Sequence, residues 1–268
     1  MSLIKPPYWS RLQRGYPVAR GLSSCYPMSE GAGHTVYDLT GNGVHGAATN
    51  TSWVTRAVGT GLSFDGSTSY VNCGGELSWS DALTVIAVVT YPMSDTSYPT
   101  IVGKWGSDSG AKYQWKVSSH YGGVARPYMG VSGDGTNPTY RQSSQTLIGG
   151  QTYMIAGVYE PGRLDIYVDA VKVNATLSAA IPSSLYASSA DVVMGCQSLD
   201  ATPILFFGGD LHDLKLFDRA LAASEIECLY RHQHQLYHRD PIELWTAAAG
   251  GVTPPAVVPC PYYSRMVG

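Results

Sequence analysis

The sequence predicts an all-β fold, and three observations support this prediction. Charged residues make up only 14% of the 268 residues, while glycine (30) and tyrosine (19) are abundant. From Gly21 to Tyr230 the chain is a series of short apolar runs separated by Gly, Asn, Asp, Ser and Pro. Short strands joined by tight polar turns produce this pattern in β-sandwiches. A chain of this length can bury a hydrophobic core large enough to stabilise the fold without a metal or a disulfide.

Three apolar runs predict strands at the centre of the fold. Residues 83–91 (LTVIAVVTY) are apolar at both odd and even positions, which is typical of a strand buried on both faces. Residues 152–160 and 163–173 predict two consecutive strands. Asp169 and Ala170 stand where a two-residue hairpin turn is expected, although alanine lacks the ease of glycine at positive φ.

The segment 208–232 changes from a strand pattern to a helical one. Ile226, Leu229 and Tyr230 follow the i, i+3, i+4 spacing of one helix face. We therefore expect one short C-terminal helix that closes the sandwich.

The chain divides into an extended N-terminal arm (1–20), a β domain (21–231) and an irregular tail (232–268). Prolines in the arm and the tail prevent regular pairing, and both segments carry large rings. We expect these rings to attach the protein to neighbouring copies or to a carrier, the alternative being that both ends fold back over the same sandwich. The candidate attachment residues are Tyr8, Trp9, Trp245 and Tyr262.

Charge and cysteine usage exclude several classes of protein. The formal net charge is −3 and no Lys/Arg cluster is present, which argues against nucleic-acid binding. No run is apolar enough for a membrane span, and the N-terminus lacks the apolar core of a secretory signal. The five cysteines are widely spaced and form no metal-binding pattern, so we expect reduced, buried thiols made in a reducing cytoplasm.

Several motifs occur in a characteristic order. They are GLSSCYPMSEGAGHTVYDLTGNGVHG, GLSFDGSTSYVNCG, YPTIVGKW, TYMIAGVYEPGRLDIYVDAVKV and FFGGDLHDLKLFDRALAASEIECLY. Over residues 21–231 this series resembles the laminin G-like, concanavalin A-like jelly-roll domains. The resemblance implies a two-sheet antiparallel jelly roll that serves recognition or structure, often with one structural calcium ion near a sheet edge. It does not imply catalysis.

The loop YDLTGNGVHG (37–46) is the candidate calcium site. Asp38 offers a carboxylate and Asn42 an amide oxygen, and oxygen atoms are the ligands that calcium prefers. The resemblance places Asp210 at the start of the last strand, where it could add a second carboxylate. His212 stands at a position that is commonly acidic in the family and weakens this assignment. The alternative is a tight turn in which Asp38 bonds the backbone without metal.

An aromatic, Gly/Ser-rich region is the candidate ligand site. Trp105, Tyr113, Trp115, Tyr121 and Tyr128 cluster here, and sugars or protein surfaces dock on exposed rings with polar neighbours. We select Trp105 and Tyr121 as ligand-binding residues. The alternative is that these rings belong to the core, which is favoured for Trp115.

No catalytic constellation is visible in the sequence. Glycan-cleaving enzymes place two carboxylates close together, and the nearest approach here is Asp165 with Asp169. The sequence also lacks a Gly-x-Ser-x-Gly elbow and a phosphate-binding loop. We expect no enzymatic activity.

These observations predict a non-enzymatic virion surface protein of a tailed phage, as a capsid decoration, head fibre or adhesin. The lead-in KPP…RLQRGYPVARGL resembles the start of laminin G-like proteins encoded in phage genomes. The expected partners are a capsid or other virion protein, further copies of the chain and a cell-surface glycan, on a virion assembled in the host cytoplasm. The alternative is a glycan-binding module of a bacterial cell-surface protein, which would require an export signal or a further domain.

Overall fold

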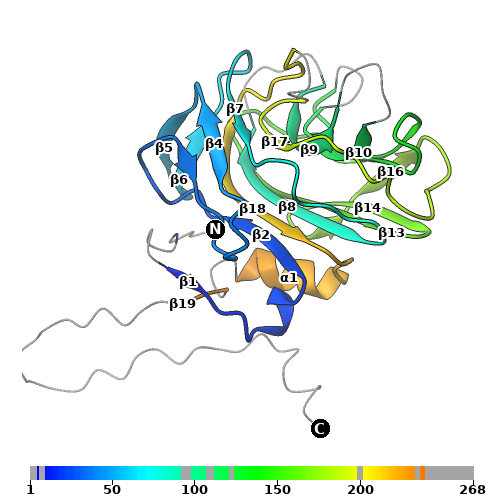
Figure 1. Ribbon diagram of the computed structural model, residues 1–268, viewed down its shortest axis with the longest axis horizontal. Coiled ribbons are helices and arrows are strands. Elements are labelled where there is room, and N and C mark those ends of the chain that lie inside the picture. The colour runs from blue at the N-terminus through cyan, green and yellow to red at the C-terminus, as the bar shows by residue number, and fades with distance from the viewer. Residues whose placement is uncertain are drawn as a thin grey trace, which may run out of the picture. The chain divides into compact units, whose positions relative to one another are not determined.

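The computed structural model is a two-layer antiparallel β-sandwich with one short α-helix (Figure 1). It describes residues 5, 10–91, 98–106, 112–120, 124–197, 202–232 and 236–238. The two layers are a nine-stranded and an eight-stranded sheet. This architecture confirms the predicted all-β sandwich and is consistent with a jelly roll.

The strands and helices have the following bounds. The nine-stranded sheet runs through β16 (Asn174–Leu177), β12 (Pro138–Ser143), β11 (Tyr128–Ser132), β10 (Tyr113–Ser118), β9 (Thr100–Trp105), β17 (Val192–Met194), β7 (Tyr70–Asn72), β4 (Gly46–Thr49) and β3 (Thr35–Val36). The eight-stranded sheet runs through β15 (Val171–Lys172), β14 (Arg163–Val168), β13 (Thr152–Glu160), β8 (Leu83–Thr90), β18 (Asp210–Phe217), β6 (Gly59–Ser63) and β5 (Ser52–Arg56), with β2 (Leu22–Tyr26) paired to β18. The remaining elements are β1 (Arg11–Leu12), which pairs with β19 (Tyr237–His238), the 3-10 helix η1 (Pro17–Ala19) and α1 (Ala223–Arg231).

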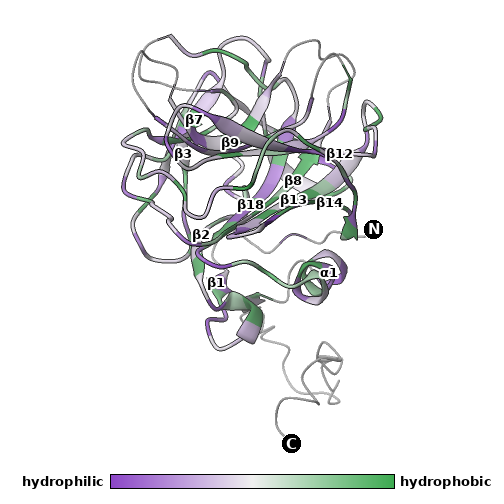
Figure 2. Ribbon diagram, turned by 90° about the vertical axis from the view of Figure 1, so that its right-hand side faces the viewer, coloured by the Kyte–Doolittle hydropathy of each residue, from purple (hydrophilic) through white to green (hydrophobic). Residues whose placement is uncertain are grey.

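Strand β8 is buried on both faces, as the apolar run predicted. Leu83, Val85 and neighbours of the same parity join the core between the sheets. Ile86 and Val88 join a second core on the opposite face, beneath α1. Figure 2 shows why this strand has two apolar faces: the nine-stranded sheet lies on one side of it and α1 on the other.

The predicted hairpin and helix are both present. Asp169 and Ala170 adopt φ angles of 50° and 66° between β14 and β15, as a two-residue turn of this kind requires. Helix α1 buries Ile226 and Leu229, and the Glu225 carboxylate accepts a hydrogen bond of 2.9 Å from the Ala222 backbone N–H. Because alanine has no side-chain acceptor, this bond is the surviving half of a capping box.

The described part of the N-terminal arm packs back on the sandwich. Val18 is buried in the second core, where Tyr16 is partly buried. The Lys5 ammonium donates hydrogen bonds to the carbonyl oxygens of Pro27 (2.6 Å), Met28 (3.1 Å) and His212. These contacts favour the alternative in which the arm covers its own sandwich. The rings predicted to mediate attachment lie outside the described residues; they are Tyr8, Trp9, Trp245 and Tyr262.

The described cysteines are buried, as predicted. They are Cys25, Cys73, Cys196 and Cys228. Within the described residues, no helix combines the length and apolar character needed to cross a membrane.

We predict that His212 makes the fold sensitive to acid. Its Nδ1–H donates to the Thr60 carbonyl oxygen (3.2 Å) and its Nε2 accepts from the Thr90 hydroxyl (2.8 Å). Burial lowers the pKa of His212 from 6.5 to about 4. Since the unfolded chain then binds the extra proton more readily, the free energy of unfolding should fall as the pH drops from 6.5 to about 4.

The matched variant is His212→Asn, which keeps a donor and an acceptor but cannot titrate. Urea unfolding at several pH values in this range should show a smaller acid-induced loss for the variant than for the wild type. Equal losses in the two proteins would contradict the prediction.

Candidate functional site

The outer face of the nine-stranded sheet, which points away from the sandwich core, carries the candidate site. On β10, Trp115 and Val117 belong to the core between the sheets. Because side chains alternate along a strand, Lys116 and Ser118 point to the outer face. The cross-strand neighbours of Lys116 are Gly103 on β9 and Gly130 on β11.

The two glycines leave room for large side chains on this face. A Cβ atom at Gly103 would lie 2.8 Å from the Lys116 Cβ atom. A Cβ atom at Gly130 would lie 2.8 Å from the Tyr140 ring, and 3.5 Å from the Trp105 ring. A side chain at Gly103 would therefore displace Lys116, and one at Gly130 would displace the Tyr140 ring.

Four rings form the aromatic cluster of this face: Trp105, Tyr113, Tyr128 and Tyr140. Trp105 stacks on Tyr113 with ring centroids 4.6 Å apart, and Tyr128 meets Tyr140 edge-on at 5.4 Å. Trp105 also contacts Tyr140 at 6.2 Å. Trp105 and Tyr128 are buried, whereas Tyr113 and Tyr140 are partly exposed. The partly exposed pair is therefore available to a ligand.

Lys116 lies within the aromatic cluster. Its Nζ atom is 4.9 Å from the centroid of the Trp105 ring and 5.6 Å from that of Tyr128, as in cation–π contacts. The ammonium donates a hydrogen bond of 2.7 Å to the Gln197 side-chain oxygen. Burial lowers the pKa of Lys116 to about 7.

Two buried hydroxyl groups line the same face without partners. Ser118 on β10 pairs in register with Thr100 on β9, so both side chains lie on one face of the sheet. Neither hydroxyl has a hydrogen-bond partner among the described residues, although both residues are fully buried. A buried hydroxyl without a partner costs about 1–3 kcal/mol, so these groups are suited to a bound ligand or water.

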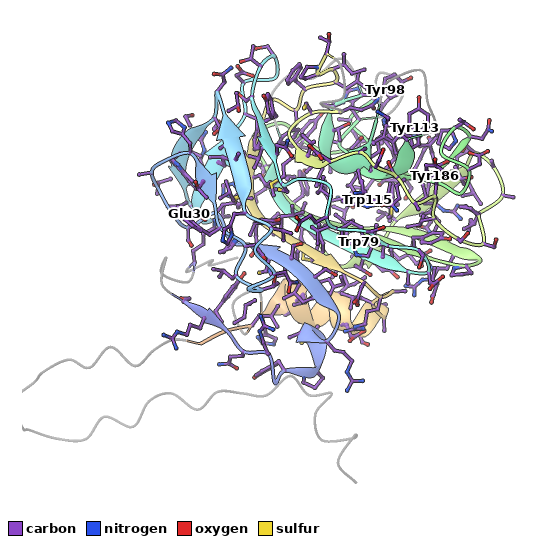
Figure 3. All side chains as sticks on the ribbon, in the orientation of Figure 1. Glu30, Trp79, Tyr98, Tyr113, Trp115 and Tyr186 are labelled. Atoms are coloured by element: carbon purple, nitrogen blue, oxygen red, sulfur yellow. The ribbon has the colours of Figure 1, made fainter. Side chains whose placement is uncertain are left out.

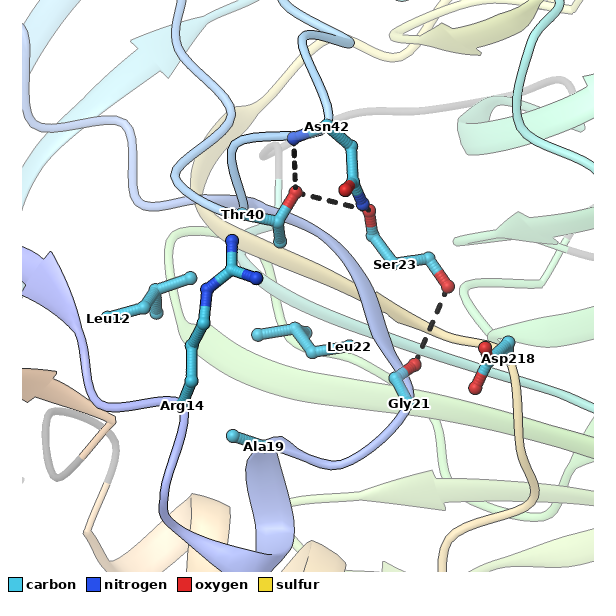
Figure 4. Close-up of a pocket in the computed structure, with 9 residues that line it drawn as sticks. All are labelled: Leu12, Arg14, Ala19, Gly21, Leu22, Ser23, Thr40, Asn42 and Asp218. Atoms are coloured by element: carbon cyan, nitrogen blue, oxygen red, sulfur yellow. Dashed lines mark hydrogen bonds between the residues drawn. The ribbon is translucent and has the colours of Figure 1, made fainter.

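Away from the outer face, a pocket of about 330 Å³ lies beside the N-terminal arm (Figure 4). Asn42 donates a hydrogen bond of 2.9 Å to the Ser23 carbonyl oxygen within its wall. Arg14 and Asp218, the charged residues of the lining, are both exposed. This pocket therefore has solvated charges and lacks the buried unpartnered groups of the outer face. Its lining consists of Leu12, Arg14, Ala19, Gly21, Leu22, Ser23, Thr40, Asn42 and Asp218.

Sequence comparison identifies the family. The profile of the concanavalin A-like lectin/glucanases superfamily (Laminin_G_3) matches residues 65–227, which is more than half of the chain. The chain belongs to this family. No curated protein sequence matches it significantly.

Solved structures of the concanavalin A-like sandwich support the fold. Domain 4 of the Geobacillus stearothermophilus arabinanase AbnA, solved with arabinotriose, is 18% identical with a TM-score of 0.58, covering 78% of this chain and 98% of the domain. The binding domain of Paraclostridial Mosquitocidal Protein 1 is 13% identical with a TM-score of 0.61, covering 80% of this chain and 53% of that one. Trypanosoma rangeli sialidase is 17% identical with a TM-score of 0.58, covering 81% of this chain and 33% of the sialidase. At these identities the likeness establishes the fold alone.

The structure corrects part of the predicted ligand site of this concanavalin A-like chain. Trp105 is only 3% exposed, so it does not form the exposed docking ring that we expected. It instead supports the partly exposed Tyr113. Trp115 belongs to the core, where it meets Trp79 edge-on at 5.4 Å (Figure 3). Tyr121 lies outside the described residues.

Several residues of the site were missed by sequence reasoning. Lys116, Gln197 and Tyr140 come from three separate strands or loops and meet only in the folded chain. The signal available in the sequence was Lys116 within the strand YQWKV. A lysine among the apolar residues of a strand requires a special environment, and this could have pointed to the site.

The predicted calcium ligands do not converge. The Asp38 carboxylate accepts hydrogen bonds from the backbone N–H groups of Cys25 (2.8 Å) and Thr40 (3.1 Å), and from the Thr40 hydroxyl. These bonds match the alternative, metal-free turn. Asp210 pairs with Arg56 at 2.7 Å.

Position along β18 explains why the two carboxylates lie apart. Cys25, which Asp38 contacts, pairs with Lys215. Asp210 lies five residues earlier on the same strand, about 17 Å away at the usual rise per residue. Asp38, Asn42 and Asp210 therefore do not fit as joint ligands of one ion, and the described residues contain no group of three or more His, Cys, Asp or Glu that could hold a metal. That the chain binds a structural calcium ion stays a prediction.

We predict that Asp38→Ala destabilises the fold by about 1–3 kcal/mol, because it leaves buried N–H groups without an acceptor. The loss should be the same in calcium and in chelator, since the carboxylate is engaged by the chain itself. Urea unfolding in calcium and again in chelator would measure the loss of stability under each condition. Asp218→Ala, which removes an exposed carboxylate, is the control and should change stability by less than about 0.5 kcal/mol. A loss that appears only in calcium would instead assign the loop to metal binding.

Proposed function

We propose that the chain is a non-enzymatic binding module that takes a carbohydrate on the outer face of its nine-stranded sheet. The observation that carries this proposal is the aromatic cluster around Lys116, with two buried hydroxyls beside it that have no partner among the described residues. Aromatic rings offer apolar faces to sugars, and the polar groups between them fix orientation. The arabinotriose complex of the similar arabinanase domain is consistent with such a role.

The contacts of the two carboxylates that come nearest to a catalytic pair support a role without catalysis. Asp165 bonds Arg163 (2.7 Å), Lys172 (2.9 Å) and Asn174 (2.6 Å). Asp169 accepts a hydrogen bond of 2.8 Å from the Met154 backbone N–H across the hairpin. Both carboxylates are thus engaged in holding strands together and are not directed at a shared substrate position.

The virion role is part of the same proposal. Its support is the N-terminal lead-in, which resembles that of laminin G-like proteins in phage genomes, together with the buried free thiols that fit a reducing compartment. On this proposal the chain is made in the host cytoplasm and joins the particle surface as a decoration, fibre or adhesin, in contact with a capsid protein and with its own copies. Mass spectrometry of purified particles tests this role, and a chain absent from the particles would refute it.

For carbohydrate binding, we predict that Tyr113→Ala and Tyr140→Ala each weaken the interaction about tenfold, which corresponds to about 1.4 kcal/mol. A glycan array screened with the wild-type chain would identify the sugar, and calorimetry would compare the variants. Tyr37→Ala is the matched control, because Tyr37 is also an exposed tyrosine (39%) but follows β3 at the far edge of the sheet. Unchanged affinity in both cluster variants would place the binding surface elsewhere.

We also predict that the chain releases no reducing sugar from polysaccharides, since Asp165 and Asp169, the nearest approach to a catalytic pair, are both engaged by the chain itself. Reducing-end assays with the wild type and Asp165→Asn would test this. Sugar release by the wild type that is lost in Asp165→Asn would show that the proposal of a pure binding module is wrong.

A further inference from the structure

The Lys116 ammonium is a buried cation that has no counter-ion in the part of the chain that the structure describes. Its residue is only 4% exposed, and its hydrogen-bond acceptor is the neutral side-chain oxygen of Gln197. Among the described residues, no carboxylate forms an ion pair with it. Lys215, which is equally buried, pairs with both oxygens of Asp213 at 2.5 and 2.6 Å. Over the described ranges, one buried ammonium is thus neutralised by a carboxylate and the other is not.

A buried charge without a partner is costly, and a bound anion would remove that cost. Lysine has three donor hydrogens, and the bond to Gln197 uses one of them. The rings of Trp105 and Tyr128 attract the cation but accept no conventional hydrogen bond. Donor capacity therefore remains on the Lys116 ammonium.

Two hydroxyl donors lie on the same face of the sheet as this lysine. Ser118 is two residues from Lys116 along β10, about 7 Å at the usual rise, and Thr100 is its cross-strand partner. Neither hydroxyl has a partner among the described residues. One ammonium and two hydroxyls without acceptors form a donor set for an anion.

We propose that this donor set, comprising Lys116, Ser118 and Thr100, binds the carboxylate of an acidic sugar. This inference rests on the proposed carbohydrate function and specifies its ligand class. One cation matches the single charge of a carboxylate, whereas a phosphate or sulfate ester is usually held by arginine forks or several cations. The sugar ring would lie against the partly exposed Tyr113 and Tyr140.

The Tyr140 ring controls access to the donor set. It lies over Gly130, the cross-strand neighbour of Lys116, and it is partly exposed. A ligand reaches the ammonium when this ring turns aside. Such rotamer changes are common when a binding surface takes its partner.

Acetate tests the anion site without requiring the correct sugar. The full chain is titrated with sodium acetate against sodium chloride at constant ionic strength, and NMR follows the side-chain Cε and Nζ resonances of the lysines. We expect a saturable shift at Lys116 and none at Lys104, a buried lysine that donates to the Gly75 carbonyl oxygen at 2.8 Å. Ser118→Ala and Thr100→Val should each weaken acetate binding at least threefold. No acetate-dependent shift at Lys116 would overturn the site.

Sugars then test the ligand class. A galacturonic acid trimer is compared by calorimetry with its methyl ester, which has the same ring but no charge. We expect the acid to bind at least tenfold more tightly, Lys116→Met to abolish this preference, and the matched control Lys104→Met to retain it. Equal affinity for acid and ester would overturn the acidic-sugar inference and leave carbohydrate binding intact. An acetate shift at Lys116 with no sugar bound in the glycan array would support the anion site and reject the proposed function.

Discussion

Strand β8 is the constraint on which the rest of the structure depends. It pairs with β13 over its full length and with β18 on its other side, so it holds the centre of the eight-stranded sheet. Its side chains are apolar in both directions, and two apolar faces require two covers. The nine-stranded sheet supplies one cover, and α1 with the N-terminal arm supplies the other. The helix and the arm are thus parts of the core and not appendages.

The two sheets therefore differ in how many of their faces are used for the core. The eight-stranded sheet is buried on both sides at its centre, while the nine-stranded sheet uses only its inner face for the main core. The outer face of the nine-stranded sheet can therefore carry groups that a core would reject, such as Lys116 and two hydroxyls that have no partner among the described residues. On the proposed function, stability and recognition depend on opposite faces of one layer, so substitutions in the aromatic cluster would change binding while the sandwich persists.

Sequence reasoning succeeded where the signal was local. The run at 83–91, the turn at Asp169 and the helix near Ile226 each follow from the periodicity of neighbouring residues. It failed where the prediction depended on which face of the sheet each residue of a strand occupies. A register shift between Tyr113 and Trp115 places Tyr113 opposite Trp105 and Trp115 opposite Lys104, and alternation alone does not reveal such a bulge.

Contacts between residues far apart in the sequence set the second limit on prediction. Lys116 and Gln197 lie 81 residues apart, and no pattern in the chain joins them. The predicted calcium ligands do not meet for a related reason: Asp38 bonds Cys25, which lies opposite Lys215 of β18, whereas Asp210 is the first residue of that strand. Oxygen-rich composition identifies possible ligands, but only the register determines which of them meet.

The contacts of Lys5 and β1 also dictate an order of events during synthesis. Lys5 donates to the carbonyl oxygen of His212, and β1 pairs with β19 at Tyr237. The arm can therefore bond Pro27 and Met28 early, but it has its full set of partners only after nearly the whole described chain has been synthesised. Contacts of such sequence separation form slowly, and until they form β18 and the face under α1 remain open to other chains. The arm lies ahead of the sandwich in the chain, yet its contacts with β18 and β19 are completed only when those strands are in place.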